Sequence, residues 1–399
     1  MQYETLDSLC KVASGGTPSR SKKEYWEDGS IPWIKIGNIK NKYVSEADEF
    51  ITEAGLNNSS AKLFSKGTIL YTIFATLGEV GILTIDACTN QAIAGITIEK
   101  TDLITTDYLY YYLKSKKAEV NQIGRGVAQN NINLSILKKF SVPLRGKKEQ
   151  EKIVTVLKHI EIAIENKKLE LANLDNLVKA RFVEMFGMPG ANPKGWNEIK
   201  LGEVCDLQNG YAFKSSDYVD RSSVLNCRMS NIRPDGGFDA EYHPKYLPEE
   251  YWDKCSNYRL FDGDVIIAMT DMASDPKILG VPTIVSTNGK KFLLNQRVGK
   301  LSFLHDDRIN RVYLMHSLGQ KYIRKELAKS AAGSTQINVG KPAILNIDIY
   351  EPPRLFQNQF ADFVARVDKS KFAIIIELAV CNFYIRLIHD RVMHGRINL

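Results

Sequence analysis

The chain has 399 residues, of which 44% are hydrophobic, and a formal net charge of +7. This length suits two or three domains, and the composition is ordinary for a soluble globular protein with a sizeable core. Basic and acidic side chains are spread along the whole chain without a basic tail. Charge alone therefore does not single out nucleic acid as a partner, because folding would have to gather the basic residues on one face.

The N-terminus is polar and shows no signal-peptide pattern. The most apolar run, residues 372–388, is interrupted by Glu377, Asn382 and Arg386, so we do not expect it to span a membrane. The six cysteines form no CxxC pair, which favours buried free thiols over a metal site. We therefore expect a cytoplasmic protein with no metal and no cofactor.

The sequence contains a long internal repeat, which predicts two similar domains in tandem. The offset between matching segments grows along the chain, so the halves differ mainly by loop insertions. The clearest pair is "GRGVAQNNINLSILKKFSVPL" (124–144) and "AGSTQINVGKPAILNIDIYEPP" (332–353). Other matching pairs are 6–18 with 201–213, 63–72 with 260–270, 90–96 with 295–301, and 107–115 with 311–320.

Local patterns indicate an α+β domain in each half. Short β-branched runs follow glycine at 67–73 and 263–269, as expected of strands. Residues 106–123 carry apolar side chains at helical spacing and begin at a threonine, Thr106, that can cap a helix.

A long helical pattern with coiled-coil spacing follows each domain. Apolar positions alternate by four and three, and each helix would be roughly 55 Å long. Gly187 and Pro189 are expected to end the first helix. The two predicted seams match position for position: Ile153, Leu157, Ile160, Ile164, Lys167, Leu171, Leu174, Val178, Arg181 and Met185, and Phe360, Val364, Val367, Lys371, Ile374, Leu378, Cys381, Ile385, Ile388 and Val392.

Pairing the two helices within the chain is the simplest way to bury both seams. An antiparallel pair would place the domains at opposite ends of a rod, related by a pseudo-two-fold axis. The expected fold is thus α+β, with two similar tandem recognition domains and an antiparallel intramolecular coiled coil. The expected boundaries are 1–146 for the first domain, 147–187 for the central helix, 188–355 for a linker plus the second domain, and 356–399 for the C-terminal helix.

Motifs for catalysis are weak. Residues 333–342, "GSTQINVGKP", miss the spacing of a phosphate-binding loop, and Pro342 replaces its hydroxyl residue. "EPPR" at 351–354 lacks the amide and the aromatic ring with which amino-methyltransferases hold a flipped base. No histidine lies beside a serine or cysteine in a nucleophile motif. We expect no catalytic residues.

Polar and basic residues recur at matching loops of both halves, and such side chains contact phosphates and base edges. A solvated surface explains any single one better than DNA binding does, so the recurrence in both halves is what favours nucleic-acid binding. The candidate DNA-contacting residues are Thr17, Ser19, Arg20, Lys22, Lys35, Asn38 and Lys40 in the first half, Lys214, Arg228, Ser230, Asn231 and Arg233 in the second, and Arg125, Gln129, Thr335 and Gln336 in the repeated phrase.

Taken in order, "GGTPSR" (15–20), "WIKIGNI" (33–39), the repeated phrase leading into "EQEKIV" (149–154), and "MFGMPGANPKGW" (185–196) resemble the specificity subunit of type I restriction–modification enzymes. The resemblance spans essentially the whole chain. It implies two target-recognition domains that read the halves of a split DNA target, with the helices setting their separation. It also implies a non-catalytic subunit that docks two methyltransferase subunits and works with restriction/translocase subunits.

The C-terminal helix is more apolar than such subunits usually have. We expect Phe372, Ile375, Ile376 and Phe383 to contact a partner subunit. The alternative function is a stand-alone tandem DNA-binding or scaffold protein without enzymatic partners. The sequence does not give the DNA target or its spacer.

Overall fold

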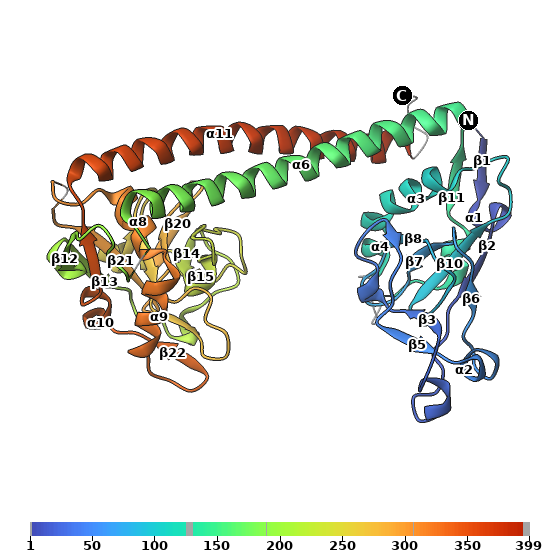
Figure 1. Cartoon of the computed structure of the whole chain (residues 1–399), viewed down its shortest axis with the longest axis horizontal. Coiled ribbons are helices and arrows are strands. Elements are labelled where there is room, and N and C mark those ends of the chain that lie inside the picture. Colours follow the sequence, from blue (N-terminus) through green and yellow to red (C-terminus); the bar gives the residue numbers. More distant parts are fainter. Residues whose placement is uncertain (1, 125–130, 189, 306, 394–399) are drawn as a thin grey trace. The chain divides into compact units, whose positions relative to one another are not determined.

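The computed structural model describes residues 2–124, 131–188, 190–305 and 307–393. It divides into two compact units (Figure 1). Unit 1 comprises residues 1–169 and 374–399, and unit 2 comprises residues 170–373. Both boundaries fall inside the long helices α6 (Lys147–Phe186) and α11 (Arg354–Leu387), so each unit holds one recognition domain and part of each helix.

The described residues of unit 1 form three sheets. The largest has the strand order β2-β10-β7-β8-β4, the second has the order β5-β3-β9-β6, and β1 pairs with β11. The strands are β1 (Gln2–Thr5), β2 (Cys10–Ser14), β3 (Ile31–Ile34), β4 (Tyr43–Val44), β5 (Glu49–Ile51), β6 (Leu63–Phe64), β7 (Ile69–Thr72), β8 (Val80–Leu83), β9 (Ala87–Thr89), β10 (Ile93–Ile98) and β11 (Ser141–Leu144). The antiparallel β1–β11 pair, with Thr5 opposite Ser141, joins the chain start to the strand that leads into α6.

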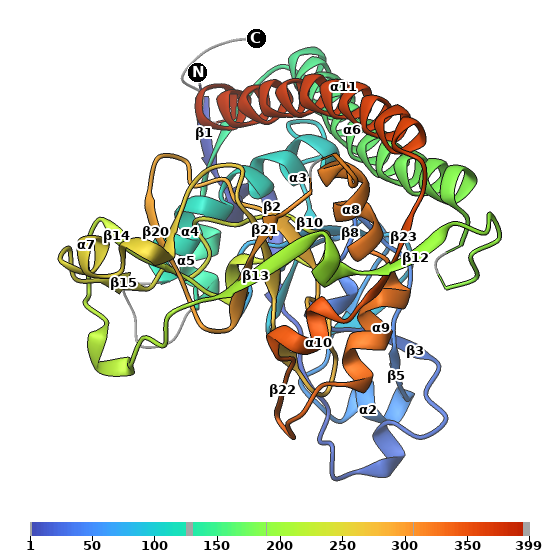
Figure 2. The same cartoon turned by 90° about the vertical axis from the view of Figure 1, so that its left-hand side faces the viewer.

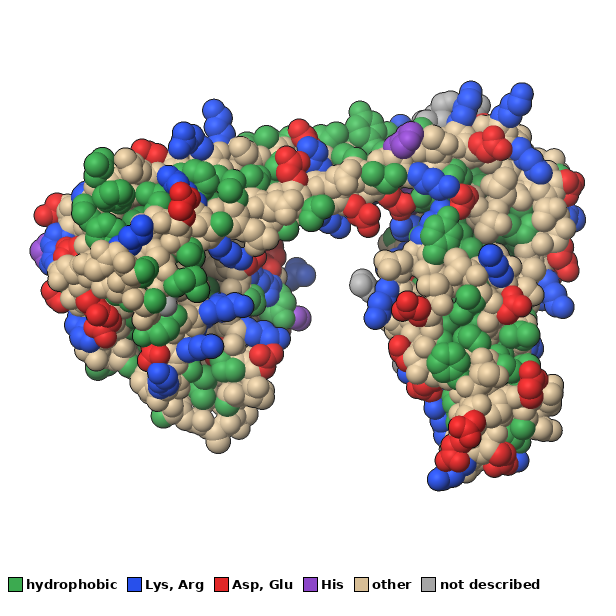
Figure 3. All heavy atoms as spheres, viewed as in Figure 1, with side chains coloured by type: hydrophobic (Ala, Val, Ile, Leu, Met, Phe, Trp, Pro, Cys, Tyr) green, Lys and Arg blue, Asp and Glu red, His purple; other side chains and the backbone are tan. Residues whose placement is uncertain are grey.

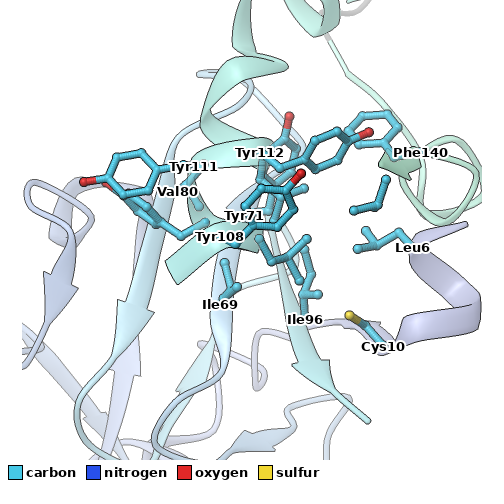
Figure 4. Close-up of a cluster of buried hydrophobic side chains, with 14 of the residues drawn as sticks. Leu6, Cys10, Ile69, Tyr71, Val80, Ile96, Tyr108, Tyr111, Tyr112 and Phe140 are labelled. Atoms are coloured by element: carbon cyan, nitrogen blue, oxygen red, sulfur yellow. The ribbon is translucent and has the colours of Figure 1, made fainter. Parts of the chain in front are cut away.

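The core of unit 1 lies under helix α3 (Thr106–Ser115), which Thr105 caps. Tyr108 and Tyr112 of this helix are fully buried beside Tyr71 of β7 (Figure 4). The helix expected over 106–123 is two helices, since α3 ends at Ser115 and α4 (Lys117–Gly124) follows a turn at Lys116. The remaining short helices are α1 (Leu6–Leu9), α2 (Glu53–Asn57) and α5 (Leu134–Lys138).

Unit 2, which faces the viewer in Figure 2, has counterparts of these sheets, as the internal repeat predicts. Its described residues differ in two ways: the main sheet lacks a counterpart of the edge strand β4, and β18 and β22 form an additional two-stranded sheet. Its orders are β13-β21-β17-β19 and β15-β14-β20-β16, while β12 pairs with β23 as β1 does with β11. The strands are β12 (Asn197–Lys200), β13 (Cys205–Asn209), β14 (Val224–Cys227), β15 (Tyr246–Leu247), β16 (Arg259–Leu260), β17 (Val265–Ala268), β18 (Thr270–Met272), β19 (Pro282–Ile284), β20 (Lys291–Leu294), β21 (Val298–Phe303), β22 (Gln336–Asn338) and β23 (Asp348–Glu351), and the helices are α7 (Tyr251–Lys254), α8 (Arg311–Leu318), α9 (Lys321–Lys329) and α10 (Lys341–Leu345).

The repeated phrase has the same structural position in both units. The Ile132 N–H donates to the Ile73 carbonyl at 3.0 Å, and the Val339 N–H donates to the Met269 carbonyl at 2.9 Å. A short helix, α5 or α10, follows in each unit and leads to β11 or β23. The phrase therefore carries the chain from the recognition domain to its long helix.

A buried glutamine ties each long helix to its domain. Gln150 donates to the carbonyls of Leu103 (2.7 Å) and Arg145 (2.8 Å) and accepts from the Thr105 N–H (2.9 Å). In unit 2, Gln357 donates to the carbonyls of Arg308 (3.1 Å) and Pro352 (2.7 Å), and accepts from the Asn310 N–H (2.7 Å). Thr105 and Asn310 cap α3 and α8. We call each of these buried glutamines, with its three hydrogen bonds to main-chain groups, a latch. The two latches make equivalent hydrogen bonds in the two units.

Within each unit, α6 and α11 pack antiparallel. In unit 1, Leu157 of α6 shares a core cluster with Ile388, just past the end of α11, and Lys167 pairs with Glu377 at 2.7 Å. In unit 2, Phe182 packs edge-on against Phe360, and Lys371 pairs with Asp175 at 2.5 Å. Every predicted seam residue with a described side chain is buried or half-buried, which confirms the seam; the side chain of Val392 lies outside the described residues.

Among the described residues, one helix is long and apolar enough to cross a membrane by length and composition. It is Arg354–Arg391, whose most apolar window has a mean hydropathy of 1.7 and is 11% buried. Seam residues of this helix such as Phe360 and Val364 are buried in a core cluster that includes residues of α6, whereas Phe372, Ile375, Ile376 and Phe383 are exposed.

We predict that Gln357→Leu lowers the free energy of unfolding of unit 2 by about 2–4 kcal/mol, because two carbonyls and one N–H lose their buried partner. Urea unfolding followed by circular dichroism measures this loss. The matched control is Gln359→Leu, the same substitution at an exposed position two residues along α11. Equal stability of the two variants would contradict the latch.

A second prediction concerns His316 of α8, which packs edge-on against Phe360 at 5.1 Å between ring centroids. Burial lowers the pKa of His316 from 6.5 to about 4. The unfolded chain therefore binds a proton below pH 6.5 that the folded chain does not, and stability present above that pH is lost as the pH falls towards 4.

The expected loss at pH 5 is about 2 kcal/mol. His316→Gln cannot titrate, so its melting temperature should fall less between pH 7 and pH 5 than that of the unaltered chain. Parallel pH dependences for the two chains would show that His316 does not carry the effect.

Candidate nucleic-acid interface

A short 3-10 turn follows equivalent strands in the two units. After β3, Lys35 enters the turn Ile36–Asn38, and its N–H donates to the Asn38 side chain at 2.9 Å. After β14, Arg228 enters the turn Met229–Asn231, and its N–H donates to the Asn231 side chain at 2.8 Å. The asparagines thus shape the turn, and the basic residue before each turn lies at the same place in both units.

Asn231 is 3% exposed and its amide also donates to the Asp239 carbonyl at 2.8 Å. Its hydrogen-bonding groups are occupied within the fold, so the turn depends on it. The Arg228 side chain donates a hydrogen bond to the His243 carbonyl at 2.9 Å. His243 lies in the loop between β14 and β15, so this bond holds the guanidinium against that loop.

In unit 1, the guanidinium of Arg20 lies over an aromatic side chain. Its guanidinium carbon is 3.6 Å from the ring centroid of Trp26 and 4.9 Å from that of Trp33. Glu49 of β5 pairs with Arg20 at 2.5 Å and with Lys35 at 2.6 Å. Hydrogen bonds from Lys35 and Arg20 hold the pKa of Glu49 below its usual range, although burial opposes this.

Unit 2 has a comparable arrangement at Arg233. Its guanidinium carbon is 4.0 Å from the ring centroid of Tyr242, and it forms an ion pair with Asp239. The hydrogen bond from Arg233 lowers the pKa of Asp239. Each unit therefore has an arginine held between an aromatic ring and a carboxylate.

Gly15 and Gly210 occupy equivalent positions in the two units, where the chain packs closely against a turn. A Cβ at Gly15 would overlap the Asn90 carbonyl, and one at Gly210 would overlap the Asn295 carbonyl. These glycines make room for a turn of their own unit rather than for a ligand.

That turn exposes a glutamine in each unit, Gln91 and Gln296, which the sequence analysis did not select. In unit 1 the Gln91 side chain accepts a hydrogen bond from the Thr17 hydroxyl. These two glutamines could have been selected from the sequence, because the matching segments 90–96 and 295–301 both begin with Asn-Gln.

The remaining candidates lie on the same loops. Lys22 donates to the Tyr25 hydroxyl at 2.9 Å, and the Ser230 hydroxyl is buried without a partner among the described residues. Exposed or half-exposed positions are Ser19, Lys40, Lys214, Thr335 and Gln336, of which Gln336 pairs with Met272 between β22 and β18. Arg125 and Gln129 lie outside the described residues.

An apolar face lies on α11 away from the seam. Phe372, Ile375, Ile376 and Phe383 are 49–66% exposed. Hydrophobic side chains are visible on the surface along the helices in Figure 3. These residues do not pack against α6, so the face is open to a partner.

The cysteines do not form a reactive centre. Cys10 and Cys205 begin the equivalent strands β2 and β13 and are buried, as is Cys227. Burial raises the pKa of Cys10 and of Cys227 to about 12, which keeps both thiols protonated and inert at neutral pH.

The family model described as "Type I restriction modification DNA specificity domain" matches residues 1–174 and again residues 193–378. The chain belongs to this family. The two matches correspond to the two halves of the repeat, so the family assignment covers both recognition domains.

Two curated relatives come from Methanocaldococcus jannaschii. The chain is 34% identical over 248 residues to the type I restriction enzyme MjaIX specificity subunit, which covers 57% of each sequence. It is 27% identical over 362 residues to the MjaVIII specificity subunit, which covers 86% of this chain and 78% of the relative. The first match thus spans little more than half of that relative's length.

Solved structures show the same fold. A structure from work on complex assembly and conformational transition of the type I R-M system matches with a TM-score of 0.62 and 16% identity, covering 99% of this chain and 98% of the other. The S subunit of a type I restriction–modification system from M. genitalium matches with a TM-score of 0.51 and 16% identity, covering 98% and 96%.

Proposed function

We propose that this chain is the DNA sequence-specificity subunit of a type I restriction–modification complex and that it reads a bipartite target with a fixed spacer. The observation that carries the proposal is the duplication of one recognition domain, each copy matching the specificity-domain family. Two copies that share the order of four strands in each main sheet but have different loops suit the reading of two different half-sites.

The proposed domains are 1–146 and 188–355, followed by the helices at 147–187 and 356–399. Within them we assign DNA contacts to the loops around the two turns and to the repeated phrase. The proposed contacts comprise Thr17, Ser19, Arg20, Lys22, Lys35, Asn38, Lys40, Arg125, Gln129, Lys214, Arg228, Ser230, Asn231, Arg233, Thr335 and Gln336. Asn38 and Asn231 would act by shaping the turns that present their neighbours.

The relatives are specificity subunits, so we infer that this chain does not catalyse a reaction by itself. Two methyltransferase subunits would dock on it, and restriction/translocase subunits would complete a cytoplasmic complex. The alternative, a stand-alone tandem DNA-binding or scaffold protein, has no observation in its favour beyond the repeat itself.

The test is to co-express the chain with the modification subunit from its own operon and to map adenine methylation by single-molecule sequencing. We expect methylation at a split motif with one spacer length. Replacing residues 14–42 with those of another family member should change one half-site only. A stable, folded complex that leaves no methylated motif would refute the proposed function.

A separate prediction concerns the apolar face of α11. Phe383 is 61% exposed, and Phe383→Glu should reduce the amount of methyltransferase subunit that co-purifies with the chain, because a buried carboxylate at an apolar interface is costly. Ile162→Glu is the control, since Ile162 is 54% exposed on α6 in the same unit. If both variants assemble as the unaltered chain does, the face is not the docking site.

A further inference from the structure

Glu49 lies between Arg20 and Lys35, two cations of the proposed DNA-binding surface of unit 1. It lies on β5, directly opposite Trp33 of the antiparallel strand β3, which leads to Lys35. Its carboxylate pairs with Lys35 at 2.6 Å and with Arg20 at 2.5 Å. The three side chains are 30–53% exposed, so they lie at the surface rather than in the core.

The pairing changes what the two cations can offer to DNA. Two cations and one carboxylate carry a net charge of +1, not +2, at neutral pH. The carboxylate also takes the place that a phosphate would take beside the guanidinium. The Arg20 guanidinium lies over the ring of Trp26, which restricts its movement, and those of its five N–H groups that do not pair with Glu49 remain available as donors.

We propose that Glu49 is a specificity-determining residue of unit 1 that reduces binding to DNA of any sequence while leaving Arg20 and Lys35 able to contact base edges. This inference rests on the proposed function. Glu49 acts through the two cations, so it is a positioning residue with an electrostatic effect.

The physical argument separates two parts of DNA affinity. Contacts to phosphate release counterions, do not depend on sequence, and weaken steeply with salt. Base edges are neutral acceptors, and a guanidinium in a fixed plane can still donate to them. A carboxylate beside the cations repels phosphates but not the neutral base edges. It therefore weakens the sequence-independent binding to phosphate more than the binding to bases.

The same combination in unit 2 supports the inference independently. Arg233 is stacked on Tyr242 and paired with Asp239, although these residues follow β14 whereas Arg20 precedes β3. The combination of an arginine, an aromatic ring and a carboxylate therefore occurs on two loops at different places in the domain.

The test uses the assembled methyltransferase complex with Glu49→Gln. Binding to a target duplex and to a scrambled duplex is measured over a series of salt concentrations. For the scrambled duplex we expect affinity to rise several-fold, and the slope of log affinity against log salt to steepen by about one, since one further positive charge becomes available. The ratio of target to scrambled affinity should fall.

The matched control is Glu27→Gln, which removes the same charge from the same region. Within the part of the chain that the structure describes, Glu27 forms one ion pair, with the exposed Lys23 four residues earlier, at 3.2 Å. A general effect of net charge would change both variants equally, whereas the proposal predicts a change for Glu49→Gln alone. Glu49→Asp keeps the charge and should keep the slope of the unaltered complex, and its melting temperature reports on folding at this position.

If the Glu49→Gln complex binds the two duplexes with the same affinities as the Glu27→Gln complex, the inference is overturned and the proposed function is left intact. A different result, equal affinity of the unaltered complex for target and scrambled duplexes, would refute the proposed function and the inference together.

Discussion

The glutamine at the start of each long helix is the constraint on which the arrangement of each unit depends. A glutamine amide carries two donors and an acceptor, and in both units all of them are used by main-chain groups of the domain. In each unit one partner is the N-cap residue of the helix that covers the core, Thr105 or Asn310. Another is the residue just after the strand that leads into the long helix, Arg145 or Pro352. Because a buried unpaired group costs about 1–3 kcal/mol, the first turn of each long helix has one favourable orientation on its domain.

Pairing of the long helices follows from that orientation. The seam residues bury the apolar stripe, and the polar positions within it select the direction and register. Lys167 pairs with Glu377 in unit 1, and Lys371 pairs with Asp175 in unit 2. In both pairs a seam lysine reaches a carboxylate on the flank of the other helix. Both contacts form in the antiparallel register, so the polar positions of the seam help to specify a pairing that apolar residues alone would leave open.

Much of this architecture could be predicted from the sequence, because it depends on periodicity and repetition. The seams, the paired strands and the end of α6 before Gly187 all follow from local patterns, and Gly187 adopts the positive φ of 88° expected there. The candidate interface could be predicted only in part. Arg20 and Lys35 look like free cations in the sequence, and the carboxylate that holds them comes from a strand fourteen residues after Lys35, as its hydrogen bond records. Such a pairing depends on the register of β3 against β5, which composition and spacing do not give.

The same distinction explains how one scaffold can support two different recognition surfaces. The shared strand orders of the sheets, the glutamine latches and the turns shaped by Asn38 and Asn231 are equivalent in the two units, and all of them involve main-chain groups. The arginine–aromatic–carboxylate groups involve side chains on loops, and they occur before β3 in one unit and after β14 in the other. Main-chain interactions tolerate changes of side chain, so loops can diverge without loss of the fold. The two units can therefore differ in what they contact while remaining the same structure.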